Sequence, residues 1–488
     1  MRNVTGHTPT GLLSIAFAAA CLAACGPGAN APDRAPLADK WLTRAQASYK
    51  AGDVEDALHA ARAALDVAPR DPDVRMINAR IALASLEFAR VLKLTDGLQT
   101  SEAFGLRGRA HWYAGDIEAA ADDLEAALRD PSVRDPWARD IAGLARRGVG
   151  RHPFELEGGV VVPIEMPRAA AALVVPCELE GERILAMVAT ASGEVIVDSN
   201  SRREPAWVNL RFGDRIEVKD VPALTQDLSG ISRQLGAPVK ALLGVNLLRH
   251  LHATFDRRGD QFVVRRQDPP PPPDASRVPL FYVRGGGMLM RAQVSPREDG
   301  NGMFLVDSSQ AYLLALTDPM WRKAGVDPAR LAPEPAIANA KSGAIPQFRL
   351  GGFDLPQVPA VEGVNIGGAQ QGIDVELGGV MGAPLLSAFR VTFGDDGRFV
   401  WMEPDPSMAL RGREPAAGPD VPSPSVGPGP GPSVGPGQLA PPSLAPDPSG
   451  APKPGAATTK PAAGAPSKPA PPSSNAAPPG ASSPPVKK

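Results

Sequence analysis

The chain contains the stretch Phe304-Leu305-Val306-Asp307-Ser308-Ser309, in which three apolar residues run directly into an acid and two hydroxyl residues. An apolar run that ends in polar turn residues predicts a buried strand that stops at the acid. A second stretch, Val380-Met381-Gly382, precedes a short helical pattern and then an alternating strand. The sequence therefore predicts a β domain with one carboxyl side chain at the end of a buried strand.

These two stretches resemble one lobe of a retropepsin-like aspartic protease. In that family the acid follows a strand as Asp-Thr-Gly or Asp-Ser-Gly, and an apolar-apolar-Gly segment packs beside the catalytic loop. The resemblance implies that Asp307 is the candidate catalytic acid, and that Ser308 is the hydroxyl residue that ties two such loops together. Ser309 stands where the family has Gly. Its side chain is expected to crowd the loop where a backbone amide should approach the carboxylate.

The same order of parts occurs earlier in the chain. Leu242-Leu243-Gly244 aligns with Val380-Met381-Gly382, and the alignment continues without a gap through the following strand. The strand that precedes this copy's loop ends at Ala189 and is followed by Thr190, so the copy has no acid at the equivalent position. Because an ordered match of several parts indicates an internal duplication, we expect a mainly-β body with two retropepsin-like lobes.

The expected domains follow the changes in composition along the chain. Lobe 1 covers residues 154–267 and lobe 2 covers residues 276–405, with a stiff Pro-rich linker at 268–275. Lobe 2 is about twenty residues longer than lobe 1 between its acid position and its apolar-apolar-Gly segment. In retropepsin-like lobes this interval contains the flap, so the insertion is expected to alter access to the site.

Catalysis by an aspartic protease needs two carboxylates about 3 Å apart that share one proton. The aligned positions supply only Asp307, which predicts a pseudoenzyme with a degenerate cleft between the lobes. Two alternatives stay open, and either would make the chain an active aspartic endopeptidase. Asp198 also follows an apolar strand, Val195-Ile196-Val197, and could be the second acid. Alternatively, the Asp307 of a second chain could complete the pair.

Residues 38–148 are rich in Ala and Leu with helical periodicity, and they resemble an array of tetratricopeptide (TPR) repeats. The pairs Gly52-Asp53 and Gly115-Asp116 occupy equivalent places in two units, and a shortened unit must lie between Asp73 and Thr100. Since the contacts of such arrays are local, the array is expected to fold alone. It is expected to bind a protein or peptide; a spacer role is the alternative.

Residues 1–25 are predicted to be a lipoprotein signal peptide. An apolar run from Gly11 to Ala24 ends in Leu22-Ala23-Ala24-Cys25-Gly26, which resembles the bacterial lipobox, in which the Cys is acylated after cleavage. By analogy, Gly26 favours anchoring of the chain in the outer membrane, facing the periplasm. An ordinary signal peptide is the alternative. After residue 405 the chain consists mainly of Pro, Ala, Gly and Ser, so residues 406–488 are predicted to be a disordered tail.

Several classes of function lack support in the sequence. The net charge of −2, without a basic stripe, argues against binding of nucleic acid. His250 and His252 are expected to be a structural or solvated pair on a strand, since no Cys or carboxylate with metal-ligand spacing accompanies them. The chain contains no phosphate loop and no dinucleotide fingerprint, so no cofactor is predicted. The oligomeric state is left open.

Overall fold

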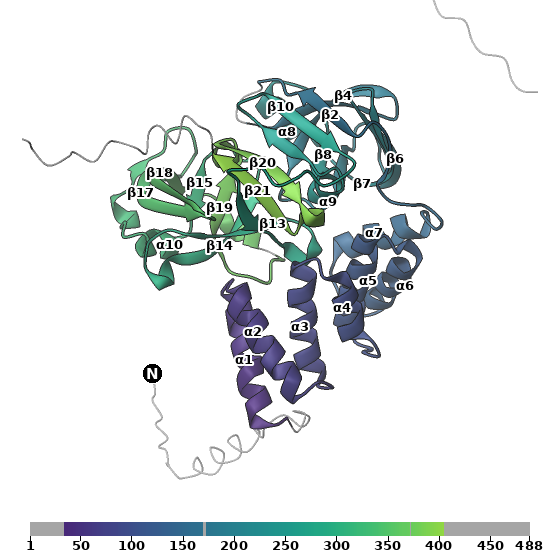
Figure 1. Cartoon of the computed structure of the whole chain (residues 1–488), viewed down its shortest axis with the longest axis vertical. Helices are drawn as coiled ribbons and strands as arrows, with labels where there is room; N and C mark the ends of the chain where they lie inside the picture. Colours follow the sequence, from purple (N-terminus) through teal and green to yellow (C-terminus); the bar gives the residue numbers. More distant parts are fainter. Residues whose placement is uncertain (1–33, 169–171, 371, 405–488) are drawn as a thin grey trace, which may run out of the picture. The chain divides into compact units, whose positions relative to one another are not determined.

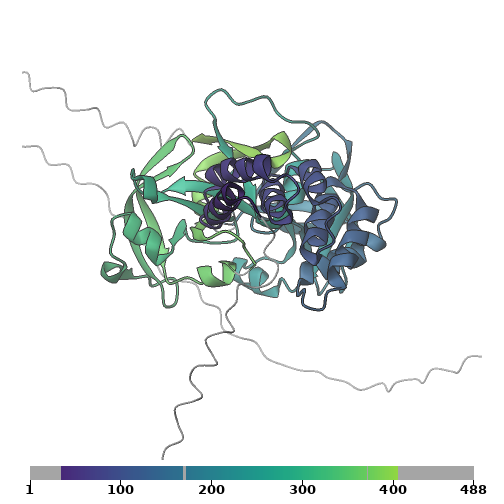
Figure 2. The same ribbon diagram turned by 90° about the horizontal axis from the view of Figure 1, so that it is seen from below.

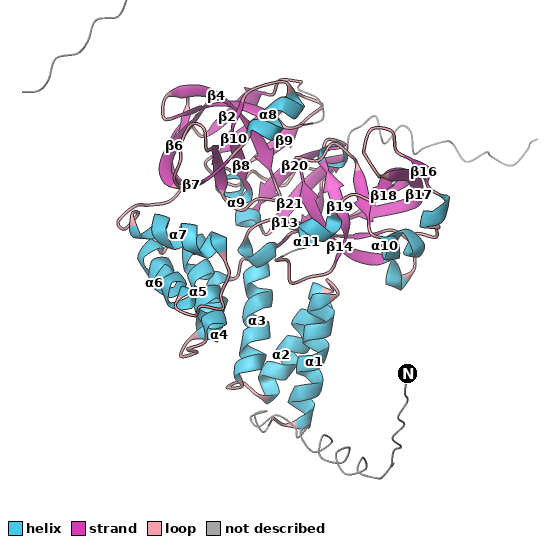
Figure 3. Ribbon diagram, turned by 180° about the vertical axis from the view of Figure 1, so that it is seen from behind, coloured by secondary structure: helices cyan, strands magenta, loops and turns pink. Residues whose placement is uncertain are grey.

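The computed structural model describes residues 34–168, 172–370 and 372–404 (Figure 1). The predicted signal peptide with Cys25 and the predicted tail lie outside the described residues. A helical array comes first, and two β lobes follow it (Figure 3). This is the predicted fold class. No helix among the described residues is long and apolar enough to cross a membrane.

The array consists of three helical pairs and a final helix. The helices are α1 (Pro36–Lys50), α2 (Val54–Val67), α3 (Pro72–Ala84), α4 (Phe88–Thr95), α5 (Ser101–Ala114), α6 (Ile117–Leu128) and α7 (Pro136–Arg146). Local signals set the helix starts, since Asp71 and Asp135 are N-caps that accept backbone N–H groups, each followed by Pro in the first turn. The middle pair is shortened as predicted, because α4 has eight residues.

Each lobe is a β barrel with short helices. The elements of lobe 1 are β1 (Glu155–Gly158), β2 (Val161–Glu165), β3 (Val174–Leu179), β4 (Glu182–Ala189), β5 (Val195–Asp198), β6 (Ala206–Phe212), β7 (Ile216–Gln226), α8 (Ser229–Leu235), β8 (Val239–Gly244), α9 (Val245–His250), β9 (Thr254–Asp256) and β10 (Gln261–Arg265). The elements of lobe 2 are β11 (Ser276–Pro279), β12 (Phe281–Tyr282), η1 (Val283–Gly285), β13 (Met288–Gln293), η2 (Glu298–Gly300), β14 (Asn301–Asp307), β15 (Leu314–Leu316), α10 (Asp318–Lys323), η3 (Pro328–Arg330), β16 (Ala332–Pro333), β17 (Lys341–Leu350), β18 (Phe353–Glu362), α11 (Ile366–Gln370), β19 (Leu377–Gly382), α12 (Ala383–Leu386), β20 (Phe389–Gly394), η4 (Asp395–Gly397) and β21 (Phe399–Pro404).

The two lobes repeat the same topology. In lobe 1 the order β7-β5-β8-β4-β3 corresponds to β18-β15-β19-β14-β13 in lobe 2. The strands β4 and β8 are parallel with Ala189 opposite Gly244, and β14 and β19 are parallel with Asp307 opposite Gly382. Each parallel pair also has a register shift at the same distance before this point. The strand pairing therefore confirms the two-lobed β body and makes Ala189 the counterpart of Asp307.

A third sheet joins the lobes. Its order, β11-β21-β20-β9-β10-β2, takes three strands from each lobe. At its centre Thr254 of β9 lies opposite Thr392 of β20, and the two buried hydroxyl groups are 2.8 Å apart. Equivalent residues thus meet across a local two-fold axis, as in a dimer made from one chain.

The array packs on the β body through the turns that join its helices (Figure 1), and seen from below its helices lie in front of the two lobes (Figure 2). The carbonyl of Lys50 accepts the backbone N–H of Glu376 at 2.7 Å. A Cβ on Gly52 would lie only 2.8 Å from the Cβ of Met303. Tyr113 at the end of α5 packs against Gly285 of η1. The contacts of the array are therefore not all local, contrary to the reason given for its independence, and that it folds alone stays a prediction.

The insertion in lobe 2 folds against its own barrel. It contains α10, η3 and β16, with Trp321 fully buried. Met320 of α10 packs on Gly302 and Gly378, at the start of β14 and β19. Gly302 is five residues before Asp307, which corresponds to about 17 Å along a strand. The insertion therefore packs near the starts of β14 and β19, away from Asp307, and its effect on access to the site stays a prediction.

Candidate functional site

The loops that follow β4 and β14 are tied to each other by four hydrogen bonds. The Ser308 hydroxyl accepts the backbone N–H of Thr190 at 3.1 Å and donates to the Val188 carbonyl at 2.7 Å. In the reciprocal arrangement, the Thr190 hydroxyl accepts the Ser308 N–H at 3.0 Å and donates to the Val306 carbonyl at 2.7 Å. Both hydroxyl residues are fully buried. This is the link that the resemblance implies for Ser308, and it holds the ends of β4 and β14 together.

The carboxylate of Asp307 is bound within its own turn. One oxygen accepts the Ser309 backbone N–H at 3.0 Å and the Ser309 hydroxyl at 2.6 Å, and the other accepts the Gln310 amide at 2.8 Å. Ser309 therefore does not keep the amide away from the carboxylate, contrary to the expectation from its side chain. Short Asp side chains commonly bond the backbone two residues on, which explains the geometry. Burial raises the pKa of the nearby Tyr312 phenol well above its usual range, and the charge of Asp307 adds to this rise.

Of the two equivalent strand ends, only that of β14 bears a carboxyl group, Asp307, because β4 ends in Ala189. Asp198 belongs to a different arrangement at the end of β5. It accepts the backbone N–H of Leu228, just before α8, at 3.3 Å, and it pairs with Lys240 at 3.4 Å. Burial disfavours its charged form, but hydrogen bonds from Leu228, Asn200 and Lys240 outweigh this and lower the pKa of Asp198. Asp198 thus holds the start of α8.

The face of the sheet that bears Asp307 is covered. Met303, Leu305 and Asp307 alternate along β14, so their side chains share one face. Met303 and Leu305 are buried in one apolar cluster with residues of the array. The members of this cluster from the array include Tyr49, Val54, Ile77, Ile81 and Ala84, and those from lobe 2 include Leu289, Met303, Leu305, Val375 and Val380. In lobe 1, Met187 and Ala189 are likewise buried in a cluster that α8 completes with Ile231 and Leu235. The apolar strand positions beside both loops therefore pack against helices instead of lining an open peptide cleft, contrary to expectation.

Two buried ionisable residues lie where α5 meets lobe 1. Glu194, which is 5% exposed, accepts a hydrogen bond from the indole of Trp112 at 3.3 Å. Burial raises the pKa of Glu194, and Trp137, Arg109, Trp112 and Tyr113 oppose part of this rise. Arg249 donates to the Tyr113 carbonyl at 2.9 Å, and burial lowers its pKa. These contacts anchor the array next to the loop that follows Ala189.

A cavity of about 460 Å³ lies between the array and lobe 2. Its floor comes from small or apolar residues of the array, among them Gly105, Leu106, Leu124, Ala127 and Ala138. Three ion pairs surround the floor: Arg80 with Glu102, Arg109 with Asp135, and Arg284 with Asp374. The cavity thus offers an apolar base and charges of both signs.

The two histidines have separate partners. His250 ends α9, where its Nδ1 lies 2.6 Å from the Asn246 carbonyl and its ring stacks on Phe154. Burial, with a contribution from Arg249, lowers the pKa of His250 to about 3. His252 lies in the next turn, 2.8 Å from a carboxylate oxygen of Asp268. The prediction of a strand was wrong for this pair. Among the described residues no group of three or more His, Cys, Asp or Glu could hold a metal ion.

Solved structures align with separate parts of the chain. The aspartic proteinase from Irpex lacteus aligns with 50% of this chain and 97% of its own, at 8% identity and a TM-score of 0.34. A retropepsin-like aspartic protease from Rickettsia conorii aligns with 26% of this chain and 90% of its own, at 19% identity and a TM-score of 0.20.

The helical part has its own counterpart. The first TPR of Spaghetti (RPAP3), solved with the HSP90 peptide SRMEEVD, aligns with 24% of this chain and 94% of its own, at 17% identity and a TM-score of 0.22. No family model and no curated protein matches the chain. The helix pairing makes the array TPR-like, and the strand order and register make the two lobes aspartic-protease-like.

Two residues of the site, Gln310 and Glu194, were not predicted from the sequence. Gln310 lies three residues after Asp307. An amide side chain at this spacing could have indicated a hydrogen bond to the carboxylate within the turn. Glu194 is aligned with Tyr312 of the second copy and precedes an apolar strand. A charged residue at a position where the other copy has an aromatic one could have indicated a buried polar contact.

Proposed function

We propose that this protein is a catalytically inactive, aspartic-protease-like lipoprotein of the bacterial cell envelope that binds a protein or peptide. The observation that carries the proposal is the single carboxyl group at the paired ends of β4 and β14. Peptide hydrolysis needs one carboxylate to take a proton from water and a second acid to protonate the leaving amine. Ala189 can do neither.

The geometry also disfavours the endopeptidase alternatives. Asp198 is bound to Lys240 and to the backbone before α8, away from the Thr190–Ser308 link. A second chain could bring its own Asp307 close only by displacing lobe 1, because Thr190 already occupies the bonding positions of Ser308. Neither route supplies a dyad without breaking buried hydrogen bonds.

Catalysis is tested with unfolded protein substrates between about pH 3 and 6, where an acid dyad operates. We expect no cleavage by the full chain, and no change on Asp307→Asn. Cleavage that depends on Asp307 would move the assignment to endopeptidase. Ala189→Asp is the matched gain-of-function variant, and we expect it to stay inactive because the faces beside both loops are covered by helices.

Binding is assigned to the 460 Å³ cavity, whose size falls within the range of about 300–1,000 Å³ that is typical of ligand sites. Its apolar base and mixed charges suit an extended peptide with residues of both signs. Gly105 gives a specific test, because a Cβ added there meets no atom within 4 Å and a larger side chain would extend into the cavity. Peptides selected from a random display library should bind the full chain and lose about tenfold or more in affinity in Gly105→Phe.

The control for this test is Gly143→Phe, since Gly143 also lies in a helix of the array but outside the lining of the cavity. Binding that survives Gly105→Phe, or that fails equally in both variants, would refute the cavity as the site.

Envelope anchoring is proposed from the sequence, with the mature chain starting at an acylated Cys25. Mass spectrometry of the N-terminal peptide decides this, and an unmodified terminus elsewhere would count against it.

A further inference from the structure

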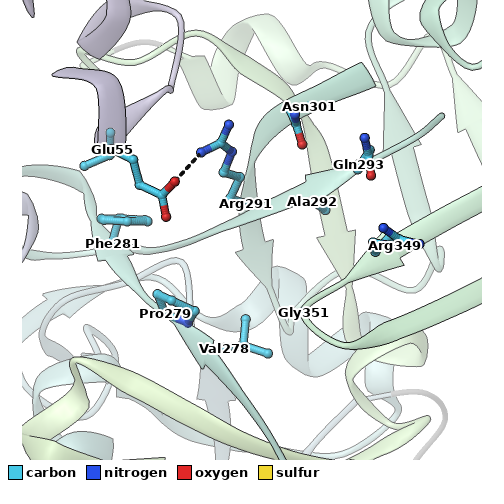
Figure 4. A pocket seen from close by; sticks show the side chains of 11 residues that line it. Glu55, Val278, Pro279, Phe281, Arg291, Ala292, Gln293, Asn301, Arg349 and Gly351 are labelled. Carbon is cyan, nitrogen blue, oxygen red and sulfur yellow. Dashed lines mark hydrogen bonds and ion pairs between the residues drawn. The ribbon is translucent and has the colours of Figure 1, made fainter. Parts of the chain in front are cut away.

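A second cavity, of about 220 Å³, lies where the first turn of α2 meets the outer face of lobe 2 (Figure 4). Val278, Pro279 and Phe281 form an apolar wall, and side chains from β13, β14 and β17 supply polar groups. The volume is below the range of about 300–1,000 Å³ for drug-sized ligands. The cavity therefore suits a ligand of one or two residues in size.

The polar groups form a row across three strands. Gln293 of β13 is paired with Asn301 of β14 on one side and with Arg349 of β17 on the other. Arg291 lies two residues before Gln293, so its side chain is on the same face. Two guanidinium groups and two amides thus stand beside one apolar wall. A mainly apolar pocket with a few convergent polar groups is typical of a small-molecule site.

Arg291 makes longer ion pairs than Arg349, the other arginine of the cavity. It lies 3.3 Å from Asp53 and 3.4 Å from Glu55, whereas Arg349 lies 2.7 Å from Asp354. Charge-assisted bonds usually measure about 2.7–2.9 Å, so the bonds of Arg291 are long. Asp53 is fixed because it caps α2 by accepting the Asp56 N–H. Glu55 is 84% exposed and is therefore the partner that can move away.

We propose that this cavity binds a small ligand with a carboxylate on an apolar body, such as the C-terminal residue of a peptide. The carboxylate replaces Glu55 on Arg291, the apolar body lies on Pro279 and Phe281, and the amide of Gln293 bonds the adjoining peptide group. The site goes beyond the proposed function, since its lining residues and ligand differ from those of the 460 Å³ cavity. Because Arg291 also bonds the array through Asp53 and Glu55, ligand binding weakens one of the ion pairs that hold α2 on lobe 2.

Titration calorimetry of the full chain with N-acetyl-alanyl-phenylalanine tests the proposal, and the C-terminal amide of the same compound is the matched probe. We expect the acid to bind about tenfold or more tightly than the amide, and Arg291→Gln to remove this difference. Glu55→Gln should tighten binding of the acid a few-fold, because it removes the competing carboxylate but keeps Arg291. Arg330→Gln is the control, since Arg330 is 87% exposed and lies outside the cavity.

Equal affinity for acid and amide, or no binding of the acid at about 1 mM, overturns the proposal. So does binding that Arg291→Gln leaves unchanged. Arg291→Gln could lower the melting temperature and so lose binding through unfolding. In that case Glu55→Gln is the deciding variant. If Glu55→Gln folds normally but binds the acid no more tightly, the ligand carboxylate does not replace Glu55 on Arg291. Gly105→Phe should leave this binding intact, so failure here is separate from failure of the proposed function.

Discussion

Ser308→Ala tests whether the exchange of hydrogen bonds between the lobes holds the β body together. The substitution removes one hydroxyl and leaves two buried backbone groups, the Thr190 N–H and the Val188 carbonyl, without this partner. An unsatisfied buried polar group costs about 1–3 kcal/mol. The expected loss in the free energy of unfolding is therefore about 2–6 kcal/mol. Thr190→Val should have a similar effect, since its hydroxyl serves Ser308 and Val306 in the same way.

The assay is urea denaturation of the full chain, followed by circular dichroism and by the fluorescence of the tryptophans. Ser309→Ala is the matched control, because its half-buried hydroxyl bonds only the adjacent Asp307 carboxylate and the Gln310 amide. We expect this variant to lose about 1 kcal/mol or less. If Ser308→Ala is no less stable than Ser309→Ala, the link does not carry the stability that we assign to it. Transitions that differ between the two probes would show that the chain does not unfold in a single two-state step.

Three further predictions concern the interface and the buried titratable groups. The array alone, as residues 34–150, should melt about 10 °C or more below the full chain, because Tyr49, Val54 and their neighbours lose the cover of lobe 2. Circular dichroism measures both melting temperatures, and equal values would contradict this. Burial raises the pKa of Glu194, so the folded state keeps a proton that the unfolded chain has released above about pH 5, and stability falls as the pH rises through this range. Glu194→Gln, which keeps an acceptor for Trp112, should flatten the dependence of melting temperature on pH between 4 and 8, and an unchanged slope would refute the assignment. Burial raises the pKa of Cys177 to about 12, so peptide mapping after iodoacetamide at pH 8 should find it alkylated only once the chain is unfolded.

Much of the site could be predicted from the sequence because its parts are local or duplicated. Strand, acid turn and apolar-apolar-Gly segment occur in the same order twice, and a repeated order restricts the register of both copies. That order alone makes Ala189 the counterpart of Asp307 and Thr190 the counterpart of Ser308, and the register of β4 with β8 and of β14 with β19 agrees with it. The shortened middle pair of helices in the array follows in the same way from the spacing between Gly52-Asp53 and Gly115-Asp116.

What the sequence alone determined is therefore the helical array, the two β lobes and the single carboxyl group at their paired loops, since periodicity and internal repetition depend on residues near each other in each copy. The tertiary structure alone decided what covers these loops. The sequence predicts a strand at Leu305 but not what its side chain packs against. In the same way, one apolar periodicity is compatible with a helix face that packs within the array and with one that packs on another domain. The docking of Tyr49 and Val54 beside Met303, and the cavity around Arg291, depend on contacts between residues more than 200 positions apart. No local pattern records such contacts, because the free energy of burial depends on the area covered and not on which segment covers it.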